Sequence, residues 1–378
     1  MNSLMKLFEF GQSYWIDNLN RKMITSGDLK RRVTAEGLRG ITSNPAIFNK
    51  AISKSDEYDG QIKDLAQQGY TTDKIYEALV IKDVQDACDI LRPVYESSEG
   101  LDGYVSLEVS PYLARHTEET MVEARHLFET VNRPNCFIKI PGTEEGLPAI
   151  EQMLYEGINI NITLLFSIER YEEVARTYIQ ALQRRAAERK DLSRIASVAS
   201  FFVSRMDVLM DQILSHRILP GKSDDTVLLS RELTGKSAIA NAKLAYQSFL
   251  RIFGSEDWKK LESLGARVQR PLWASTSTKN PKYSDVMYVE PLIGKNTVNT
   301  LPDETIEAFA DHGKAKPDTV EENVKQAQFY ISRIANMGID LDCITSQLEN
   351  EGIQKFIEPF DALMENLKDK RKSLSTGK

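Results

Sequence analysis

One lysine interrupts an otherwise apolar run, residues 136–142 (CFIKIPG). The β-prone residues of this run, followed by Pro-Gly, are typical of a short buried strand. Burying an ammonium group is costly, so Lys139 must be paired with an anion, be neutral, or serve chemistry. Because burial disfavours the charged form, such a lysine can present a neutral amine, which attacks carbonyl carbons and forms Schiff bases. The alternative is a structural lysine that reaches solvent or pairs with one carboxylate.

Other polar residues of catalytic types lie at or near the ends of predicted strands. They are Asp17, Asn44, Glu108, Asn161, Thr163 and Ser200, with a hydroxyl-rich stretch at residues 275–278. Polar residues are common where loops begin, so each position taken alone has an ordinary explanation. Taken together, these residues would be costly to bury in one place unless they served one another.

Strand alternation places several of these side chains on one face. Successive side chains of a strand point to opposite faces. Glu108 shares a face with Ser106, Asn161 shares a face with Thr163, and Lys139 lies opposite its two flanking isoleucines. The aliphatic faces suit packing against helices. We therefore expect the polar faces to point into a common interior.

A Schiff-base lysine beside two carboxylates suits the cleavage and formation of carbon–carbon bonds next to a carbonyl group. The protonated imine accepts the electron pair of a carbanion, one carboxylate deprotonates a hydroxyl group, and the other handles the water of imine formation. Asp17 and Glu108, on different strands, can divide these roles. Arg205 and Lys279 follow later strands, where barrels often bind phosphate. Arg205 could instead form an ordinary ion pair with Asp207.

Eight strand-like segments alternate with helical periodicity, which predicts a parallel α/β architecture. The expected strands cover residues 13–17, 38–44, 104–109, 136–142, 158–165, 196–202, 270–276 and 286–292. We therefore expect a (β/α)8 TIM barrel, whose active site lies at the carboxyl ends of the strands. The competing fold is an open doubly wound sheet, but no GxGxxG fingerprint follows the first strand.

The chain is longer than such a barrel requires. A (β/α)8 barrel needs about 250 residues, and the chain has 378. We expect one barrel domain over residues 1–378, with extra helices at about 46–92, an insertion loop at about 219–235 and a C-terminal helical extension at about 318–378.

The overall composition disfavours several classes of protein. The net charge is −7, from 48 basic and 55 acidic residues, and no basic block suggests a nucleic-acid partner. The three cysteines and four histidines lack the spacing of a disulfide framework or a metal site. The first ten residues lack the pattern of a signal peptide, and no apolar run is long enough to span a membrane. We expect a cytoplasmic protein without a metal, a nucleic-acid partner or a membrane partner.

Eight segments carry a specific resemblance to the transaldolase family. They are SYWIDNL (13–19), GITSNPAIF (40–48), VSLEVSP (105–111), FIKIPGTEEG (137–146), NINITLLFS (159–167), ASFFVSRMD (199–207), PLWASTSTKNP (271–281) and VEPLIGKNTVNTLP (289–302). The chain length, the 219–235 stretch and the STSTKN ending resemble the longer bacterial subfamily. The resemblance implies a (β/α)8 barrel that uses no metal or organic cofactor, acts on sugar phosphates and has a homodimer as one candidate assembly.

The resemblance also implies catalytic roles for four residues. Lys139 matches the Schiff-base lysine, and Asp17 matches the acid that deprotonates the C4 hydroxyl group of the substrate. Glu108 and Thr163 match the pair that positions the catalytic water.

Six further residues match substrate-binding positions of the family. They are Asn44, Asn161, Ser200, Phe202, Arg205 and Lys279. The two asparagines match amides that hold substrate hydroxyl groups and the intermediate, whereas Ser200 and Arg205 match substrate and phosphate contacts. Lys279 stands where shorter members have an arginine, which is a departure because an ammonium group is a point charge and not a bidentate fork.

The family reaction belongs to the non-oxidative pentose phosphate pathway. It transfers a dihydroxyacetone unit from sedoheptulose 7-phosphate or fructose 6-phosphate to glyceraldehyde 3-phosphate or erythrose 4-phosphate. Related fructose-6-phosphate aldolases release free dihydroxyacetone and carry a tyrosine where this chain has Phe202. Because a phenol can protonate the carbanion and a phenyl ring cannot, we expect transfer to exceed release. A non-catalytic barrel that binds sugar phosphates is the other alternative, since a fold does not prove an activity.

Overall fold

The computed structural model describes residues 2–218 and 223–376. Eight parallel strands form a closed barrel in sequence order, and the first strand pairs with the last. The strands are β1 (Gln12–Ile16), β2 (Gly40–Ile41), β3 (Tyr104–Glu108), β4 (Cys136–Pro141), β5 (Ile160–Leu165), β6 (Ser197–Phe202), β7 (Arg270–Ala274) and β8 (Thr297–Leu301). The predicted (β/α)8 barrel is confirmed, and the open doubly wound sheet is wrong.

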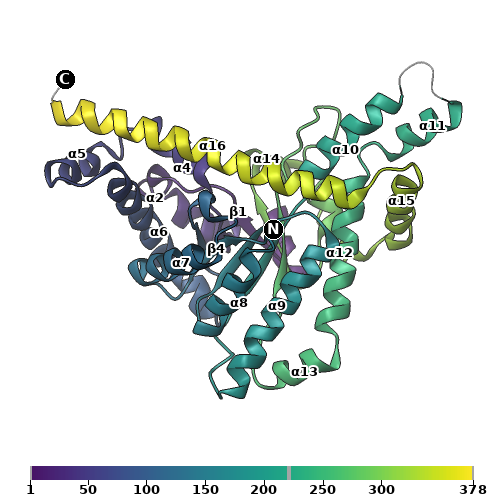
Figure 1. The fold of residues 1–378 in the computed structure, drawn as a ribbon, viewed down its shortest axis with the longest axis horizontal. Coiled ribbons are helices and arrows are strands. Elements are labelled where there is room, and N and C mark those ends of the chain that lie inside the picture. The colour runs from purple at the N-terminus through teal and green to yellow at the C-terminus, as the bar shows by residue number, and fades with distance from the viewer. Residues whose placement is uncertain (1, 219–222, 377–378) are drawn as a thin grey trace.

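Helices follow the strands and surround the barrel (Figure 1). The first half of the chain contains α1 (Ser3–Glu9), α2 (Arg21–Thr25), α3 (Asp28–Arg31), α4 (Pro45–Ser53), α5 (Asp59–Gln67), α6 (Thr72–Ser97), α7 (Thr117–Val131) and α8 (Gly146–Glu156). The second half contains α9 (Ile168–Ala187), α10 (Ser204–Arg217), α11 (Asp224–Leu233), α12 (Ser237–Phe253), α13 (Glu256–Ser263), α14 (Asp303–His312), α15 (Val324–Asn336) and α16 (Leu341–Thr376). Short helical turns are η1 (Arg32–Glu36), η2 (Pro111–Leu113), η3 (Glu290–Leu292) and η4 (Thr319–Glu321).

The eighth strand was predicted in the wrong place. Residues 286–292 form turns and η3, and β8 begins only at Thr297. Pro291 lacks the N–H group that a central strand requires. The segment instead covers the outside of the barrel, where its carbonyl groups accept hydrogen bonds from Trp273 Nε1 and Asn299 Nδ2. The apolar residues of this segment resemble a strand in the sequence because they are buried against the barrel. The true strand β8 (TVNTL) carries polar residues on both faces, so its sequence does not show the usual alternation.

The extra segments of the chain are largely helical. The helices expected at about 46–92 are confirmed as α4, α5 and α6, and the C-terminal extension is confirmed as α15 and α16. The expected insertion loop differs: residues 219–222 lie outside the described residues, and residues 224–233 form α11. Ser223 caps this helix by accepting a hydrogen bond from the Thr226 N–H group, and Leu233 is buried. A polar stretch can therefore form a helix when a capping residue begins it and its apolar side chains pack against the rest of the protein.

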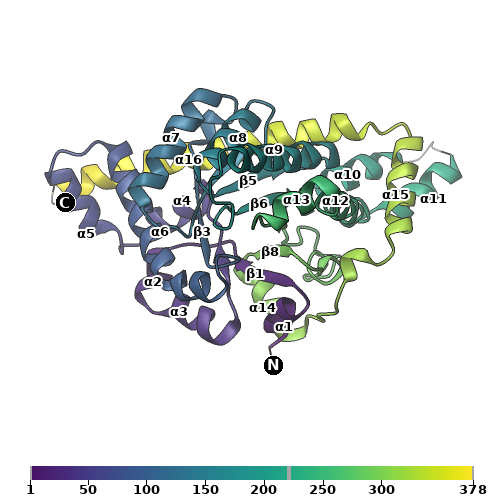
Figure 2. The same ribbon diagram turned by 90° about the horizontal axis from the view of Figure 1, so that it is seen from below.

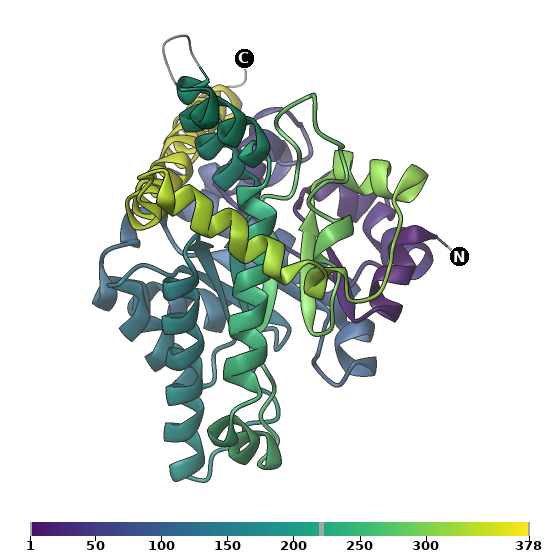
Figure 3. The same cartoon turned by 90° about the vertical axis from the view of Figure 1, so that its right-hand side faces the viewer.

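The long helix α16 runs along the molecule from the side of α15 to the side of α5, and α11 lies beyond its first residues (Figures 1 and 2). It packs on α4, α5 and α6 and reaches the end of β5. Figure 3 shows α16 on the side of the molecule away from the N-terminus, with α15 crossing the face nearest the viewer toward it. No helix of the described part of the chain is long and apolar enough to cross a membrane.

A buried charge network closes the amino end of the barrel. Arg270 is 5% exposed and donates through Nη1 to Asp102 Oδ1 (3.1 Å) and through Nη2 to Ser13 Oγ (2.6 Å). Asp102 also accepts from Arg39 Nε at 2.7 Å. Buried charges need partners, and here each charged group is paired within the network. The network fills the amino end of the barrel, so an active site can form only at the carboxyl end.

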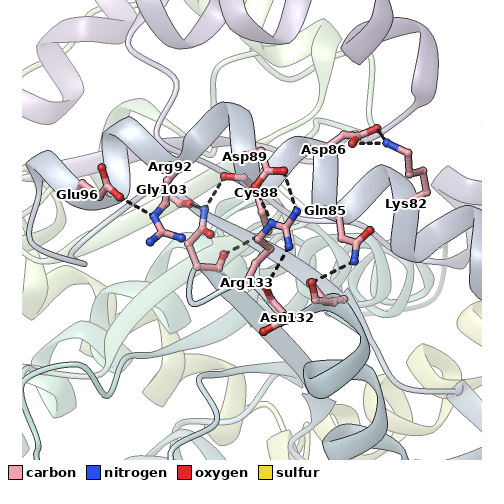
Figure 4. A network of polar contacts seen from close by, with 12 residues as sticks. Lys82, Gln85, Asp86, Cys88, Asp89, Arg92, Glu96, Gly103, Asn132 and Arg133 are labelled. Atoms are coloured by element: carbon pink, nitrogen blue, oxygen red, sulfur yellow. Dashed lines mark hydrogen bonds and ion pairs between the residues drawn. The ribbon is translucent and has the colours of Figure 1, made fainter.

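A second polar network anchors the start of β4, the strand that carries Lys139 (Figure 4). Arg133 forms a bidentate ion pair with Asp89 of α6, with N–O distances of 2.6 and 2.9 Å. Asn135 is buried, and its Nδ2 donates to the carbonyl groups of Cys88 (2.9 Å) and Gly103 (2.8 Å). These contacts tie α6 and the loop before β3 to the segment that enters β4, so the barrel fixes the position of Lys139.

Candidate active site

Lys139 lies in the interior of the barrel and is only 5% exposed. Its Nζ donates to Glu108 Oε2 at 3.3 Å and to the Ser43 carbonyl oxygen at 3.2 Å. The strand register explains this arrangement, because Glu108 on β3 and Asn161 on β5 are the lateral neighbours of Lys139 on β4. The predicted alternation is confirmed for these three strands, and Lys139 does not reach solvent.

Burial raises the pKa of Glu108 to about 7, and the nearby Lys139 ammonium opposes this rise. Its Oε1 atom is buried and has no hydrogen-bond partner among the described residues. A carboxyl group with this pKa is partly protonated near neutral pH, so it can both donate and accept a proton. Proton transfer at Lys139 therefore has a suitable partner within hydrogen-bond distance.

Asp17 follows β1 and faces the same cavity as Lys139. Burial raises the pKa of Asp17, and the Lys139 ammonium opposes this rise. Thr42 Oγ1 donates to Asp17 Oδ1 at 2.7 Å, which orients the carboxylate. The backbone N–H of Asp17 continues the ladder to the Leu301 carbonyl at 2.9 Å. A desolvated carboxylate held in this way is a stronger base than one in water.

Amide and hydroxyl groups connect β3, β5 and β6 beside Lys139. Asn161 Nδ2 donates to Ser106 Oγ at 3.0 Å, and Ser200 Oγ donates to Asn161 Oδ1 at 2.7 Å. Thr163 Oγ1 is buried without a hydrogen-bond partner among the described residues. A buried hydroxyl group without a partner is costly, so Thr163 is suited to a bound water or substrate atom.

Arg205 and Lys279 provide the positive charge at the mouth of the barrel. Arg205 belongs to the first turn of α10, and burial lowers its pKa, with Glu351 opposing this effect. Its Nη1 atom is buried and has no hydrogen-bond partner among the described residues. Lys279 Nζ donates to Ser277 Oγ. Both side chains are therefore placed to receive an anionic group of a substrate.

The alternative ion pair between Arg205 and Asp207 is wrong. Asp207 turns away from the cavity and accepts from the Ala238 N–H group at 2.7 Å and from Tyr288 OH at 2.9 Å. Arg205 instead lies over the Phe202 ring, with Cζ 5.1 Å from the ring centroid. The guanidinium group is thus held against an aromatic face and is left available to a ligand.

One cavity of about 280 Å³ brings most of the predicted site residues together. Its lining includes Asp17, Lys139, Thr163, Ser200, Phe202, Arg205 and Lys279, with Thr42, Ser275 and Thr276. Asn161 lies beside it through its bond to Ser200. No group of three His, Cys, Asp or Glu side chains in residues 2–218 and 223–376 is arranged to hold a metal ion.

Asn44 is placed differently from the other predicted residues. It lines a neighbouring cavity of about 400 Å³, which Glu108 also lines. Its Oδ1 caps α4 by accepting from the Ile47 N–H group at 3.1 Å. Glu108 therefore lines the cavity that contains Asn44 and contacts Lys139, which lines the other cavity.

Sequence reasoning missed two contributors to the site. Thr42 orients Asp17, and its place at the end of the two-residue strand β2 gave only a weak signal. Phe356 belongs to α16, and its ring centroid lies 5.3 Å from Lys139 Nζ. The apolar residues of a helix far along the chain indicate packing, and their spacing contains no information about which site they cover.

Comparison with known proteins adds independent information. The family model described as Transaldolase/Fructose-6-phosphate aldolase matches residues 14–367. The chain is 52% identical over 377 residues to "Transaldolase 2" of Nostoc punctiforme, with 99% of each chain covered. It is 49% identical to "Transaldolase" of Trichodesmium erythraeum over 377 residues, with 99% of each covered. It is 44% identical to "Transaldolase 2" of Streptomyces coelicolor over 377 residues, covering 100% of this chain and 99% of the relative.

Proposed function

This chain belongs to the transaldolase/fructose-6-phosphate aldolase family, and from this premise we propose that it is a transaldolase of the non-oxidative pentose phosphate pathway. It transfers a dihydroxyacetone unit from sedoheptulose 7-phosphate or fructose 6-phosphate to glyceraldehyde 3-phosphate or erythrose 4-phosphate. The observation that carries the proposed mechanism is the buried contact between Lys139 and Glu108, with Asp17 in the same cavity as the lysine.

The first step joins the ketose to Lys139. The neutral amine attacks the C2 carbonyl carbon, and a C–N bond forms. Glu108 in its protonated form gives a proton to the C2 hydroxyl group, which leaves as water as the C=N bond forms. The pKa of Glu108 near 7 supports this role. We propose that the hydroxyl group of Thr163, which lines the same cavity as Lys139, holds the water.

The second step breaks the C3–C4 bond. Asp17 removes the proton of the C4 hydroxyl group, C4 becomes the aldehyde of the departing aldose, and the bonding electrons move into the protonated imine. The resulting enamine attacks the aldehyde carbon of the acceptor, whose oxygen takes the proton back from Asp17. Hydrolysis at Glu108 then releases the new ketose. Asn161 and Ser200 are proposed to hold the hydroxyl groups of the sugar. Asn44 lines the neighbouring cavity, so its contact with the sugar stays a prediction.

Replacing Arg205 with alanine should weaken phosphate binding more than replacing Lys279. We expect Arg205→Ala to raise KM for fructose 6-phosphate roughly 10- to 100-fold, because charge-assisted hydrogen bonds contribute about 1.5–3 kcal/mol. Lys279→Ala should raise KM only several-fold, because Lys279 is more exposed to solvent and its Nζ already donates a hydrogen bond to Ser277 Oγ. Steady-state kinetics with fructose 6-phosphate and with unphosphorylated fructose measure the difference. Equal losses on both donors would show that these residues do not bind the phosphate.

The proposed function is tested by comparing transfer with release. With fructose 6-phosphate and erythrose 4-phosphate, sedoheptulose 7-phosphate should form much faster than dihydroxyacetone appears from fructose 6-phosphate alone. The physical reason is that Phe202 lines the cavity and has no proton to give to the carbanion. Comparable rates would favour a fructose-6-phosphate aldolase, and the absence of both reactions with retained sugar-phosphate binding would favour a non-catalytic barrel.

The setting of the enzyme is also part of the proposal. We propose a cytoplasmic enzyme, which agrees with three free cysteines, two of them buried. We propose that residues 1–378 act as one barrel domain. A homodimer stays a prediction, which light scattering of the purified protein would check.

A further inference from the structure

We propose that Phe356 of α16 is a specificity-determining residue, which shields the Lys139 intermediate from water and so favours transfer to an aldose over release. This inference rests on the proposed transaldolase function. It adds a residue from the C-terminal extension to a site that is otherwise built from the barrel.

The position of the Phe356 ring supports this role. The ring centroid lies 5.3 Å from Lys139 Nζ and 5.9 Å from Arg205 Cζ. Phe356 is 6% exposed, so the ring itself is covered by the protein. One apolar ring therefore borders both the nucleophile and the guanidinium group that is proposed to bind phosphate, and it offers no polar atom to hold water on that side of Lys139.

The backbone of α16 approaches the barrel closely one turn before Phe356. A Cβ atom added to Gly352 would lie 2.9 Å from Leu164 Cδ2 and 3.4 Å from Arg205 Nη1. Leu164 has a φ of 61° at the point where the register between β5 and β6 shifts. Glycine at position 352 thus lets the helix rest on the end of β5, which brings Phe356 to the mouth of the barrel.

Contacts on both sides of Phe356 hold the helix in this place. Before it, Asn350 Oδ1 accepts from Arg115 Nη2 at 2.8 Å. After it, Asp361 accepts from Tyr112 OH at 2.6 Å, and Lys370 Nζ pairs with Asp59 Oδ1 at 2.6 Å. The exposed contacts are individually weak, but together they fix the register of a helix whose apolar side is buried.

Transfer and release differ in whether the enamine must react with water. In transfer, the enamine carbon forms a C–C bond with the acceptor aldehyde carbon, and the aldehyde oxygen takes a proton. In release, the same carbon takes a proton from water, and the hydroxide that is left adds to C2. The proton of this new hydroxyl group then passes to the nitrogen, the C–N bond breaks, and dihydroxyacetone leaves the lysine amine. Only release requires water while the acceptor site is empty. Excluding water from an active site suppresses such side reactions of a reactive intermediate.

The test compares Phe356→Ala with Phe360→Ala, which removes the same ring one turn along α16. Phe360 packs against Tyr76 and Tyr112, with centroid distances of 5.5 and 6.2 Å. We expect Phe356→Ala to raise the ratio of dihydroxyacetone release to transfer on the order of tenfold. Phe360 lines the neighbouring cavity with Asn44 and Glu108, so Phe360→Ala can change the overall rate, but it should keep the ratio of release to transfer. An unchanged ratio in Phe356→Ala, or an equal rise in both variants, would overturn the proposal.

Two conservative variants keep the test decisive if Phe356→Ala does not fold. Phe356→Leu retains an apolar side chain and should stay near the original ratio, whereas Phe356→Gln introduces a polar group that holds water and should raise it. Equal ratios in these two variants would contradict the shield. Borohydride trapping with fructose 6-phosphate separates this failure from failure of the proposed function: an enzyme that neither forms the Lys139 adduct nor transfers is not a transaldolase, whatever Phe356 does.

Discussion

Replacing Lys139 with methionine should abolish transfer and leave the barrel folded. The variant keeps an unbranched side chain of similar length but has no amine to form the C–N bond. Removal of a covalent nucleophile lowers kcat on the order of 10⁴-fold or more. Folding should survive because the change also removes a buried ammonium, and Glu108 can become neutral at its raised pKa.

The measurement is borohydride reduction in the presence of fructose 6-phosphate, followed by mass analysis of the peptides. The unmodified enzyme should carry the adduct at Lys139, and Lys139→Met should carry none. Lys243→Met is the matched control, because Lys243 is also buried (6% exposed) but donates to the Thr319 and Glu322 carbonyl groups, between α12 and the segment before α15. An adduct on another lysine, or substantial transfer by Lys139→Met, would refute the proposed mechanism.

Replacing Glu108 with glutamine should slow formation of the Schiff base roughly 10²- to 10⁴-fold, the usual contribution of general acid–base catalysis. The amide can still accept a hydrogen bond from Lys139, so the geometry is retained while the transferable proton is lost. The measurement is the rate of borohydride-trapped adduct after rapid mixing with fructose 6-phosphate.

The rate of Schiff-base formation in the unmodified enzyme, divided by the rate in Glu108→Gln, should also depend on pH. Because the pKa of Glu108 is about 7, the carboxyl group is mostly protonated at pH 6 and mostly ionised at pH 8. The protonated form is needed to expel the hydroxyl group as water, so the rate ratio of the two proteins should fall as the pH rises through 7.

Glu123→Gln provides the control for this experiment. Burial also raises the pKa of Glu123, but this residue accepts a hydrogen bond from the Ser110 N–H group at 3.2 Å and does not contact Lys139. Its variant should keep the original pH profile. A rate ratio for Glu108→Gln that stays constant from pH 6 to pH 8 would show that Glu108 is not the proton donor.

The barrel and most of its polar interior were predictable because they depend on short-range order. Apolar runs bounded by turn residues mark the strands, and period-two alternation sets which side chains share a face. Lys139, Glu108 and Asn161 meet because their three strands pair in the register that brings equivalent inward positions side by side. The exception was β8, whose polar residues do not alternate and whose apolar neighbours at 286–292 pack outside the barrel.

By itself, the sequence determined the fold class and predicted the chemistry of Lys139 and the set of groups around it, since local patterns and residue types contain that information. Only the tertiary structure decided which groups face one another. It turned Asp207 away from Arg205, placed Asn44 in a separate cavity from Lys139, and brought the Phe356 ring centroid to 5.3 Å from Lys139 Nζ. These outcomes depend on where helices dock, and docking is a sum of many weak contacts between distant parts of the chain that no local pattern records.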